Sequence, residues 1–252
     1  MTRESLMHST IDGETLLALW EGVLAQPAAA RGDALLQTAA RNAAPACSLG
    51  ERNARLAVLH AQLFGRELEL LSHCPACGTV AQFSGDCEAL AAQMLPKIEN
   101  APHHRLEAHG HVIEFRMPSS ADIADIAVAS GDGGNEDFTQ LLLDRCVLGC
   151  SYDGNNVSAK QLPAPVLDAL SQQMETLDPG ASVSFALECP QCATHWQAPL
   201  DLGEVVWQKV RAAAEHVLLE IDVLARAYGW TEREVLRLNP LRRAAYLQMV
   251  TP

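Results

Sequence analysis

The sequence predicts an α+β fold that is mostly helical. It has a small β element formed around two distant cysteine turns, and a long C-terminal helix followed by two short helices. Both cysteine turns, Cys74–Cys77 and Cys189–Cys192, follow strand-like stretches. From Leu202 to Tyr228 apolar residues recur every three or four positions, which is the spacing of one helix face. A chain of 252 residues, 48% of them hydrophobic, can bury substantial cores.

The two cysteine turns predict a metal site. In each turn a C-P-x-C pair can direct two thiolates at one ion, and strand-like residues on both sides give the order of a zinc-ribbon hairpin. Zn²⁺ prefers four soft ligands in a tetrahedral arrangement. We therefore expect one structural zinc ion, held by Cys74, Cys77, Cys189 and Cys192. The alternatives are a redox C-x-x-C or a vestigial site, but a thioredoxin-type motif would be single and would open a helix.

The residue after each pair differs between the two turns. Gly78 follows the first pair and can take the positive φ that such a turn often needs. Ala193 takes this place in the second pair, where we expect strain on the order of 1 kcal/mol.

Four regions follow from this arrangement. Residues 1–66 form an N-terminal helical region, in which Ser48-Leu-Gly-Glu51 has the form of a capping box that opens a helix. Residues 67–83 and 182–200 form the zinc-ribbon-like module. Residues 84–181 form an inserted α/β region, whose flanks the metal would hold together, and residues 201–252 form a C-terminal helical region.

The inserted region predicts mixed secondary structure. Patterning favours helices over Cys87–Leu95, after Pro118, over Phe138–Cys150 and over Pro163–Leu177, with a hairpin over Arg105–Met117. Its histidines (His103, His104, His109 and His111) have no cysteine or carboxylate at a spacing that completes a second metal site, so we expect an exposed strand end. We expect Cys47, Cys146 and Cys150 to pack in cores, although Cys146 and Cys150 would lie on one helix face.

The C-terminal region combines clear helix signals with a reversal of charge. Asp201 is a plausible N-cap, Gly229 ends the long helix, Thr231-Glu-Arg-Glu234 is a capping box, and Asn239-Pro240 opens the last helix. After residue 225 arginines outnumber acidic residues, although the whole chain carries a net charge of −13.

Tryptophan, tyrosine and arginine carry most hot spots of protein interfaces. The candidate partner-binding residues are therefore Trp230, Arg233, Arg237, Arg242, Arg243 and Tyr246. Alternatively, Trp230 and Tyr246 pack the short helices back onto the long one. A third interpretation is a helix-turn-helix-like or zinc-ribbon regulator that binds nucleic acid. A pI near 5.0 argues against that interpretation, because nucleic-acid binders usually carry a basic surface.

Composition and motifs limit the remaining functions. No stretch reaches the roughly 18 apolar residues of a membrane span. The eight cysteines, without a signal peptide, predict a reducing cytoplasm. The sequence contains no G-x-S-x-G, H-E-x-x-H or H-x-E…C-x-x-C motif. Four cysteine ligands would also leave zinc no open position for water, so we expect no enzymatic activity.

The order of several segments resembles a known family. These segments are Phe115-Arg-Met-Pro-Ser-Ser-Ala-Asp122, Leu142–Cys146, Cys189–Trp196, Ala227–Leu236 and Arg242–Leu247. Over roughly residues 50–252 the chain resembles the T4-type baseplate hub assembly proteins, which are encoded with contractile phage tails and related contractile injection systems. The resemblance implies a chaperone-like assembly factor or a minor structural subunit of the baseplate, with hub or spike proteins as partners. Ala193 departs from the glycine expected after the last cysteine.

Overall fold

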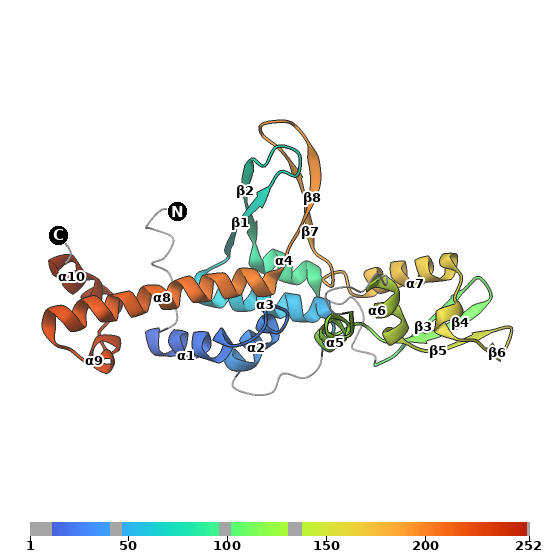
Figure 1. The fold of residues 1–252 in the computed structure, drawn as a ribbon, viewed down its shortest axis with the longest axis horizontal. Coiled ribbons are helices and arrows are strands. Elements are labelled where there is room, and N and C mark those ends of the chain that lie inside the picture. Colours follow the sequence, from blue (N-terminus) through green and yellow to red (C-terminus); the bar gives the residue numbers. More distant parts are fainter. Residues whose placement is uncertain (1–11, 41–46, 96–101, 131–137, 251–252) are drawn as a thin grey trace.

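The computed structural model describes residues 12–40, 47–95, 102–130 and 138–250, and it confirms the predicted fold class. Helices dominate, strands form small antiparallel sheets, and a long helix precedes two short C-terminal ones. Figure 1 shows an elongated molecule in which this long helix runs from one end to the middle. Of the predicted N-terminal region 1–66, residues 1–11 and 41–46 lie outside the described residues.

The helices are α1 (Gly13–Leu24), α2 (Ala28–Ala40), α3 (Leu49–Phe64), α4 (Cys87–Met94), α5 (Ser120–Ser130), α6 (Phe138–Cys146), α7 (Ala164–Leu177), α8 (Leu202–Tyr228), α9 (Glu232–Leu236) and α10 (Pro240–Val250). The strands are β1 (Glu67–His73), β2 (Val80–Asp86), β3 (His104–Ala108), β4 (His111–Phe115), β5 (Val147–Tyr152), β6 (Asn155–Asn156), β7 (Ser184–Glu188) and β8 (His195–Pro199). None of the helices in these ranges is long and apolar enough to cross a membrane.

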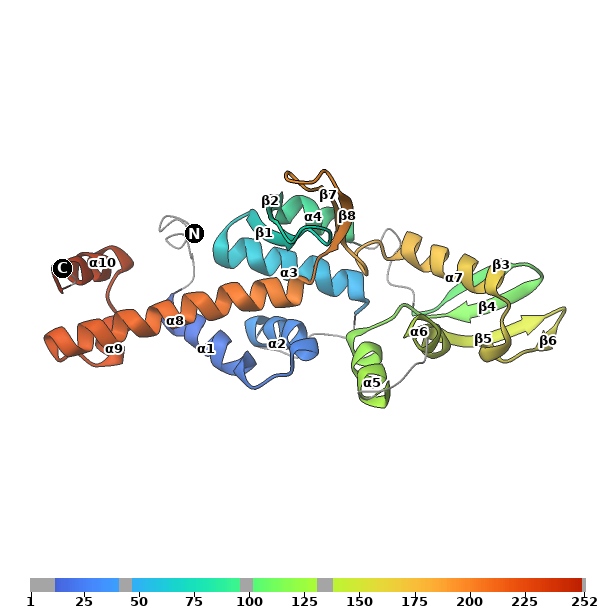
Figure 2. The same cartoon turned by 45° about the horizontal axis from the view of Figure 1, so that its top comes forward.

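Helix α8 runs over the predicted residues because its signals are local. The Asp201 side chain accepts a hydrogen bond from the Glu204 backbone N–H at the first turn. Gly229 ends the helix in the left-handed conformation, with φ of 67°. The apolar face between these ends packs on α1, α2 and α3. Buried side chains of these four helices make up most of the first core cluster. Figure 2 shows that the far end of α8 extends beyond these helices and carries α9 and α10.

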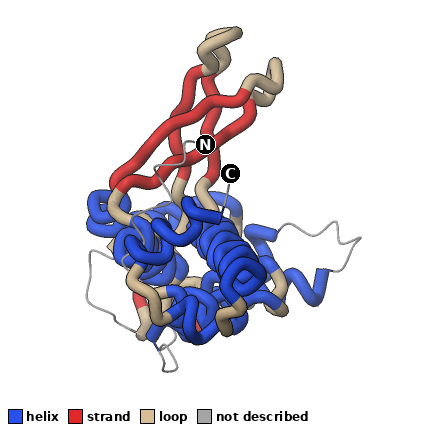
Figure 3. The backbone as a smooth tube through the Cα atoms, turned by 90° about the vertical axis from the view of Figure 1, so that its left-hand side faces the viewer, coloured by secondary structure: helices blue, strands red, loops and turns tan. Residues whose placement is uncertain are grey.

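Two β-hairpins form an arm that projects from the helical body. Strands β1 and β2 pair antiparallel, as do β7 and β8, in separate two-stranded sheets. Figure 3 shows the two hairpins rising together from the helices. At their base Leu68 and Leu70 are buried in the first core cluster, and the Phe83 and Phe185 rings meet edge-on at 5.1 Å. Hydrophobic burial therefore fixes the base of each hairpin, while the cysteine turns lie at the other end.

The inserted region has its own core. Strands β3, β4, β5 and β6 form one antiparallel sheet, and α6 and α7 pack with it in a second cluster around Ile113, Phe115, Val166 and Leu170. Helix α4 falls within the predicted insertion but packs in the first cluster, through Cys87, Ala91 and Met94.

One sequence prediction in this region is wrong. The helix predicted over Phe138–Cys150 ends at Cys146, and Val147–Tyr152 form strand β5. Cys150 lies opposite Ile113 in the β4–β5 pairing, so Cys146 and Cys150 do not share a helix face. The physical reason is that Val147 favours a strand and Gly149 disfavours a helix, while pairing with β4 satisfies the backbone.

A buried carboxylate joins the inserted region to the helical body. Asp178, directly after α7, is 2% exposed and accepts a hydrogen bond of 3.0 Å from the Gly50 backbone N–H at the start of α3. The Asn53 side-chain amide donates to the Gly180 carbonyl at 2.8 Å. A negative group at a helix N-terminus is favoured by the helix dipole, so this contact ties the two parts together.

Candidate metal centre

The first cysteine turn is held by the pairing of β1 and β2. The Cys74 backbone N–H donates to the Thr79 carbonyl at 2.9 Å, and the Gly78 N–H donates to the Cys74 carbonyl at 2.9 Å. Gly78 has φ of 72°, which is the left-handed conformation predicted for it. These bonds close a tight turn that carries Cys74 and Cys77 on one side.

The second turn repeats this backbone pattern between β7 and β8. The Cys189 N–H donates to the Thr194 carbonyl, and the Ala193 N–H donates to the Cys189 carbonyl, both at 2.9 Å. Ala193 has φ of 55°, so a residue with a β-carbon occupies the position that Gly78 fills in the first turn. The same unit of hairpin, turn and following helix thus occurs twice in the chain.

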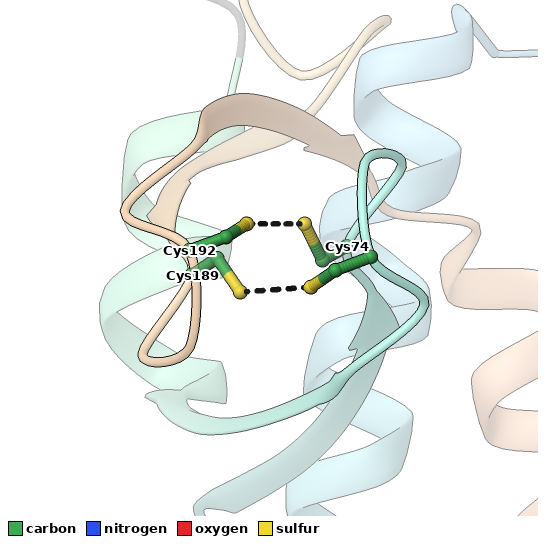
Figure 4. Close-up of side chains that lie close together, drawn as sticks. Cys74, Cys189 and Cys192 are labelled. Carbon is green, nitrogen blue, oxygen red and sulfur yellow. Dashed lines mark hydrogen bonds between the residues drawn. The ribbon is translucent and has the colours of Figure 1, made fainter.

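The two turns bring all four predicted cysteines together. Their sulfur atoms lie within 4.8 Å of one another, and among the described residues no other group of His, Cys, Asp or Glu has such a geometry. The sulfurs pair across the turns: Cys74 faces Cys192 at 3.6 Å, and Cys77 faces Cys189 at 3.5 Å (Figure 4). A tetrahedral ion with Zn–S bonds of ~2.3 Å would separate its sulfurs by about 3.8 Å. The four cysteines therefore fit a metal ion.

Burial and hydrogen bonding divide the four sulfurs into two kinds. Cys74 and Cys189 are each 2% exposed, whereas Cys77 and Cys192 are exposed. The Cys77 and Thr79 side chains are 3.2 Å apart, and the hydroxyl and backbone N–H of Thr79 lower the pKa of the Cys77 thiol to about 6. The Thr194 hydroxyl, 3.2 Å from Cys192, likewise lowers the pKa of that thiol.

Burial acts in the opposite direction on Cys189. Desolvation disfavours its thiolate and raises the pKa of the thiol to about 11. A bound cation would reverse this effect, because a coordinating thiol is deprotonated outright. Four cysteines fill a tetrahedral shell, so the chemistry this arrangement offers is structural binding of a soft or borderline metal.

The other candidate ligands do not gather. The His111 ring lies 3.0 Å from the His109 carbonyl, and the His104 ring packs on Phe115. Cys87 is fully buried with its sulfur 3.1 Å from Nδ1 of His60, which is also fully buried. Burial raises the pKa of the Cys87 thiol to about 11 and lowers that of His60 to about 4, so both are neutral core groups.

The two candidate aromatics of the C-terminal region pack on each other and on Tyr228. The Trp230 ring stacks on Tyr228 at 4.6 Å, and Tyr246 meets Trp230 edge-on at 4.9 Å. Both candidates are half-buried. This arrangement matches the alternative interpretation of the sequence, in which Trp230 and Tyr246 pack the short C-terminal helices back onto the long helix.

The candidate arginines separate into two groups. Arg243 pairs with Glu220 of α8 at 2.7 Å, and its side chain is only 13% exposed, so its charge supports the packing of α10 on α8. Arg233, Arg237 and Arg242 are exposed and have no ion-pair partner among the described residues.

Two features of the structure were missed by sequence reasoning. The first is the pair of threonines beside the exposed cysteines, although a threonine follows both turns in the sequence. The second is a polar cluster in which the Arg116 guanidinium binds both Asp122 carboxylate oxygens, at 2.7 and 2.6 Å, and the Arg145 carbonyl at 3.2 Å. This cluster brings together two of the segments that carry the family resemblance, and Arg116 keeps the pKa of Asp122 well below its usual range.

Comparison of the chain with protein-family models, with curated proteins and with solved structures finds no match.

Proposed function

We propose that this chain is a non-enzymatic, zinc-stabilised assembly factor or minor structural subunit of the baseplate hub of a contractile tail or contractile injection system. The four-cysteine cluster at the meeting of the two hairpins carries the structural part of this proposal. The assignment to a baseplate hub rests on the order of sequence segments, which resembles that of the T4-type hub assembly proteins.

Zinc is the metal that best suits the cluster. Four thiolates without a histidine or carboxylate favour zinc or iron in a tetrahedral site, and a closed set of this kind is typical of structural zinc. The ion would join hairpins that are far apart in the sequence, and it would leave no position for a substrate or water. Its role is therefore to hold the arm together, and metal binding would be coupled to folding.

The free end of α8 supports a docking role. Helices α9 and α10 extend from the body (Figure 1) and carry the exposed Arg233, Arg237 and Arg242. On α10, Leu241 is 83% exposed and Met249 is 73% exposed. Exposed apolar side chains and exposed arginines on the same two helices suit a partner with an acidic rim around an apolar contact.

Co-purification tests the docking role. The tagged full-length chain is expressed together with candidate hub and spike proteins of a contractile tail, and we expect it to retain at least one of them. Changing Arg233, Arg237 and Arg242 together to glutamate should abolish this retention and leave the fold intact. Arg211→Glu is the matched control, because Arg211 is an exposed arginine of α8 that pairs with Glu215 of its own helix.

The outcomes separate the alternatives. A wild-type chain that retains no hub or spike protein contradicts the proposal, and retention by the triple variant moves the docking site away from α9 and α10. Binding of duplex DNA that weakens steeply with salt and is lost in the triple variant would favour a nucleic-acid-binding regulator instead.

A further inference from the structure

A threonine occupies the same place beside each exposed cysteine. Thr79 follows the first turn and Thr194 the second, and each side-chain oxygen lies 3.2 Å from the sulfur of the exposed cysteine two residues before it. The carbonyl of each threonine accepts the backbone N–H of the first cysteine of its turn at 2.9 Å, which fixes its backbone. The contact therefore recurs in two hairpins that are far apart in the sequence.

A metal ion would decide the direction of these hydrogen bonds. A thiolate has no proton, so with metal bound each threonine hydroxyl must be the donor and each sulfur the acceptor. Four thiolates around a divalent cation carry excess negative charge, and a donor to an ionised acceptor forms a stronger hydrogen bond than a neutral pair does. Cys74 and Cys189 are shielded by burial, whereas Cys77 and Cys192 meet solvent.

We propose that Thr79 and Thr194 are positioning residues of the metal centre, whose hydroxyls orient the two exposed thiolates and reduce their reactivity. This inference rests on the proposed zinc site. Outer-shell partners of metal ligands typically contribute 10- to 100-fold in metal affinity. We expect a loss of this order when both hydroxyls are removed, and a smaller loss when one is removed.

Valine and serine replacements separate the hydroxyl from its other effects. Thr79→Val and Thr194→Val keep the shape and β-branching of threonine, which suit a strand, and remove only the donor. Serine at the same positions keeps the donor and removes the methyl group. Thr176→Val is the matched control, because its hydroxyl bonds the Gln172 carbonyl within α7.

Metal affinity is measured by competition with a chelator of known zinc affinity, on the full-length chain. In the Thr79→Val, Thr194→Val double variant we expect affinity to fall roughly 10- to 100-fold. The serine double variant and the control should remain within about threefold of wild type, a margin set well below the outer-shell effect. With Co²⁺ in place of zinc, the sulfur-to-cobalt charge-transfer band should move to longer wavelength in the valine double variant alone. Iodoacetamide should also alkylate the metal-bound cysteines faster in the valine double variant.

Failure of the inference and failure of the zinc site give different results. If the wild-type chain binds neither zinc nor cobalt, the proposed metal centre is wrong. If wild type binds metal and the valine double variant matches it in affinity, spectrum and alkylation rate, the threonines have no role in the centre. If the serine variant loses as much as the valine variant, the methyl groups and not the hydroxyls are responsible. A valine variant that folds poorly is judged by the single variants and by the cobalt spectrum of its folded fraction.

Discussion

The residue in the left-handed conformation that closes each cysteine turn allows the predicted backbone strain to be tested in both directions. Gly78 and Ala193 occupy the same position in two turns of the same hydrogen-bonding pattern, with φ of 72° and 55°. Exchanging their side chains should therefore change stability in opposite directions. Gly78→Ala introduces a β-carbon into a left-handed conformation, and Ala193→Gly removes one.

The magnitudes follow from backbone strain and the unfolded chain. A β-carbon added at Gly78 meets no atom within 4 Å, so the cost is conformational and not a clash. The left-handed conformation costs a non-glycine residue about 1–2 kcal/mol. Alanine also restricts the unfolded chain, which returns about 0.4–1 kcal/mol. We expect Gly78→Ala to lower the free energy of unfolding by about 0.5–1 kcal/mol and Ala193→Gly to raise it by a similar amount.

Urea denaturation at saturating zinc measures both changes, followed by circular dichroism. Gly149→Ala is the control, because Gly149 has no positive φ and its added β-carbon also meets nothing within 4 Å. We expect this control to be neutral or slightly stabilising. The reasoning would be refuted if Gly78→Ala were as stable as wild type, or if Ala193→Gly were the less stable of the pair.

Three further predictions concern parts of the fold away from the four-cysteine cluster. Gly50→Ala should lower the free energy of unfolding by about 2 kcal/mol or more, because the added β-carbon overlaps the Asp178 carboxylate; thermal melting measures this. Asp122→Ala should cost about 2 kcal/mol in the same assay, because it leaves the partly buried Arg116 without its carboxylate. Below pH 6.5 His60 becomes protonated in the unfolded chain, whereas in the folded chain it stays neutral until about pH 4. The free energy of unfolding should therefore fall as the pH drops through this interval, by roughly 3 kcal/mol at most. The fall should be less steep in His60→Leu.

The Asp122 and His60 predictions each have a control. Glu107→Ala breaks the exposed pair with Arg105 in β3 and should cost less than about 1 kcal/mol, which separates it from Asp122→Ala. An equal loss in the two variants would contradict the assigned importance of the Arg116 cluster. For His60, any metal held by the four cysteines would be lost in acid by wild type and His60→Leu alike, so only the difference between the two pH profiles tests the prediction. Parallel pH profiles would show that His60 does not titrate in this way.

Local signals account for the parts of the fold that could be predicted from the sequence. The ends of α8 follow from Asp201 and Gly229, and the cysteine spacing alone indicated which four ligands would meet. Prediction failed where a long-range contact decides the outcome. Local pattern does not show that Val147 leaves the helix to pair with β4, and nothing near Asp178 in sequence shows that it caps α3.

In the candidate site, too, local features could be predicted from the sequence and long-range contacts could not. The Cys74 to Cys192 and Cys77 to Cys189 pairing across the turns depends on how two separate hairpins pack, so spacing within a pair could not predict it. Arg243 resembles the other C-terminal arginines in sequence, yet Glu220, on a different helix, makes it a packing residue. The surface proposed for docking therefore contains fewer residues than the sequence predicted.

Metal analysis of the purified full-length chain tests the central claim most directly. We predict about one equivalent of zinc per chain, and none after Cys74→Ser is combined with Cys189→Ser, which removes one buried ligand from each turn. A Cys87→Ser, Cys150→Ser variant is the matched control and should keep its zinc, because neither cysteine belongs to the cluster. Zinc retained without Cys74 and Cys189, iron in place of zinc, or no metal in the wild-type chain would contradict the account.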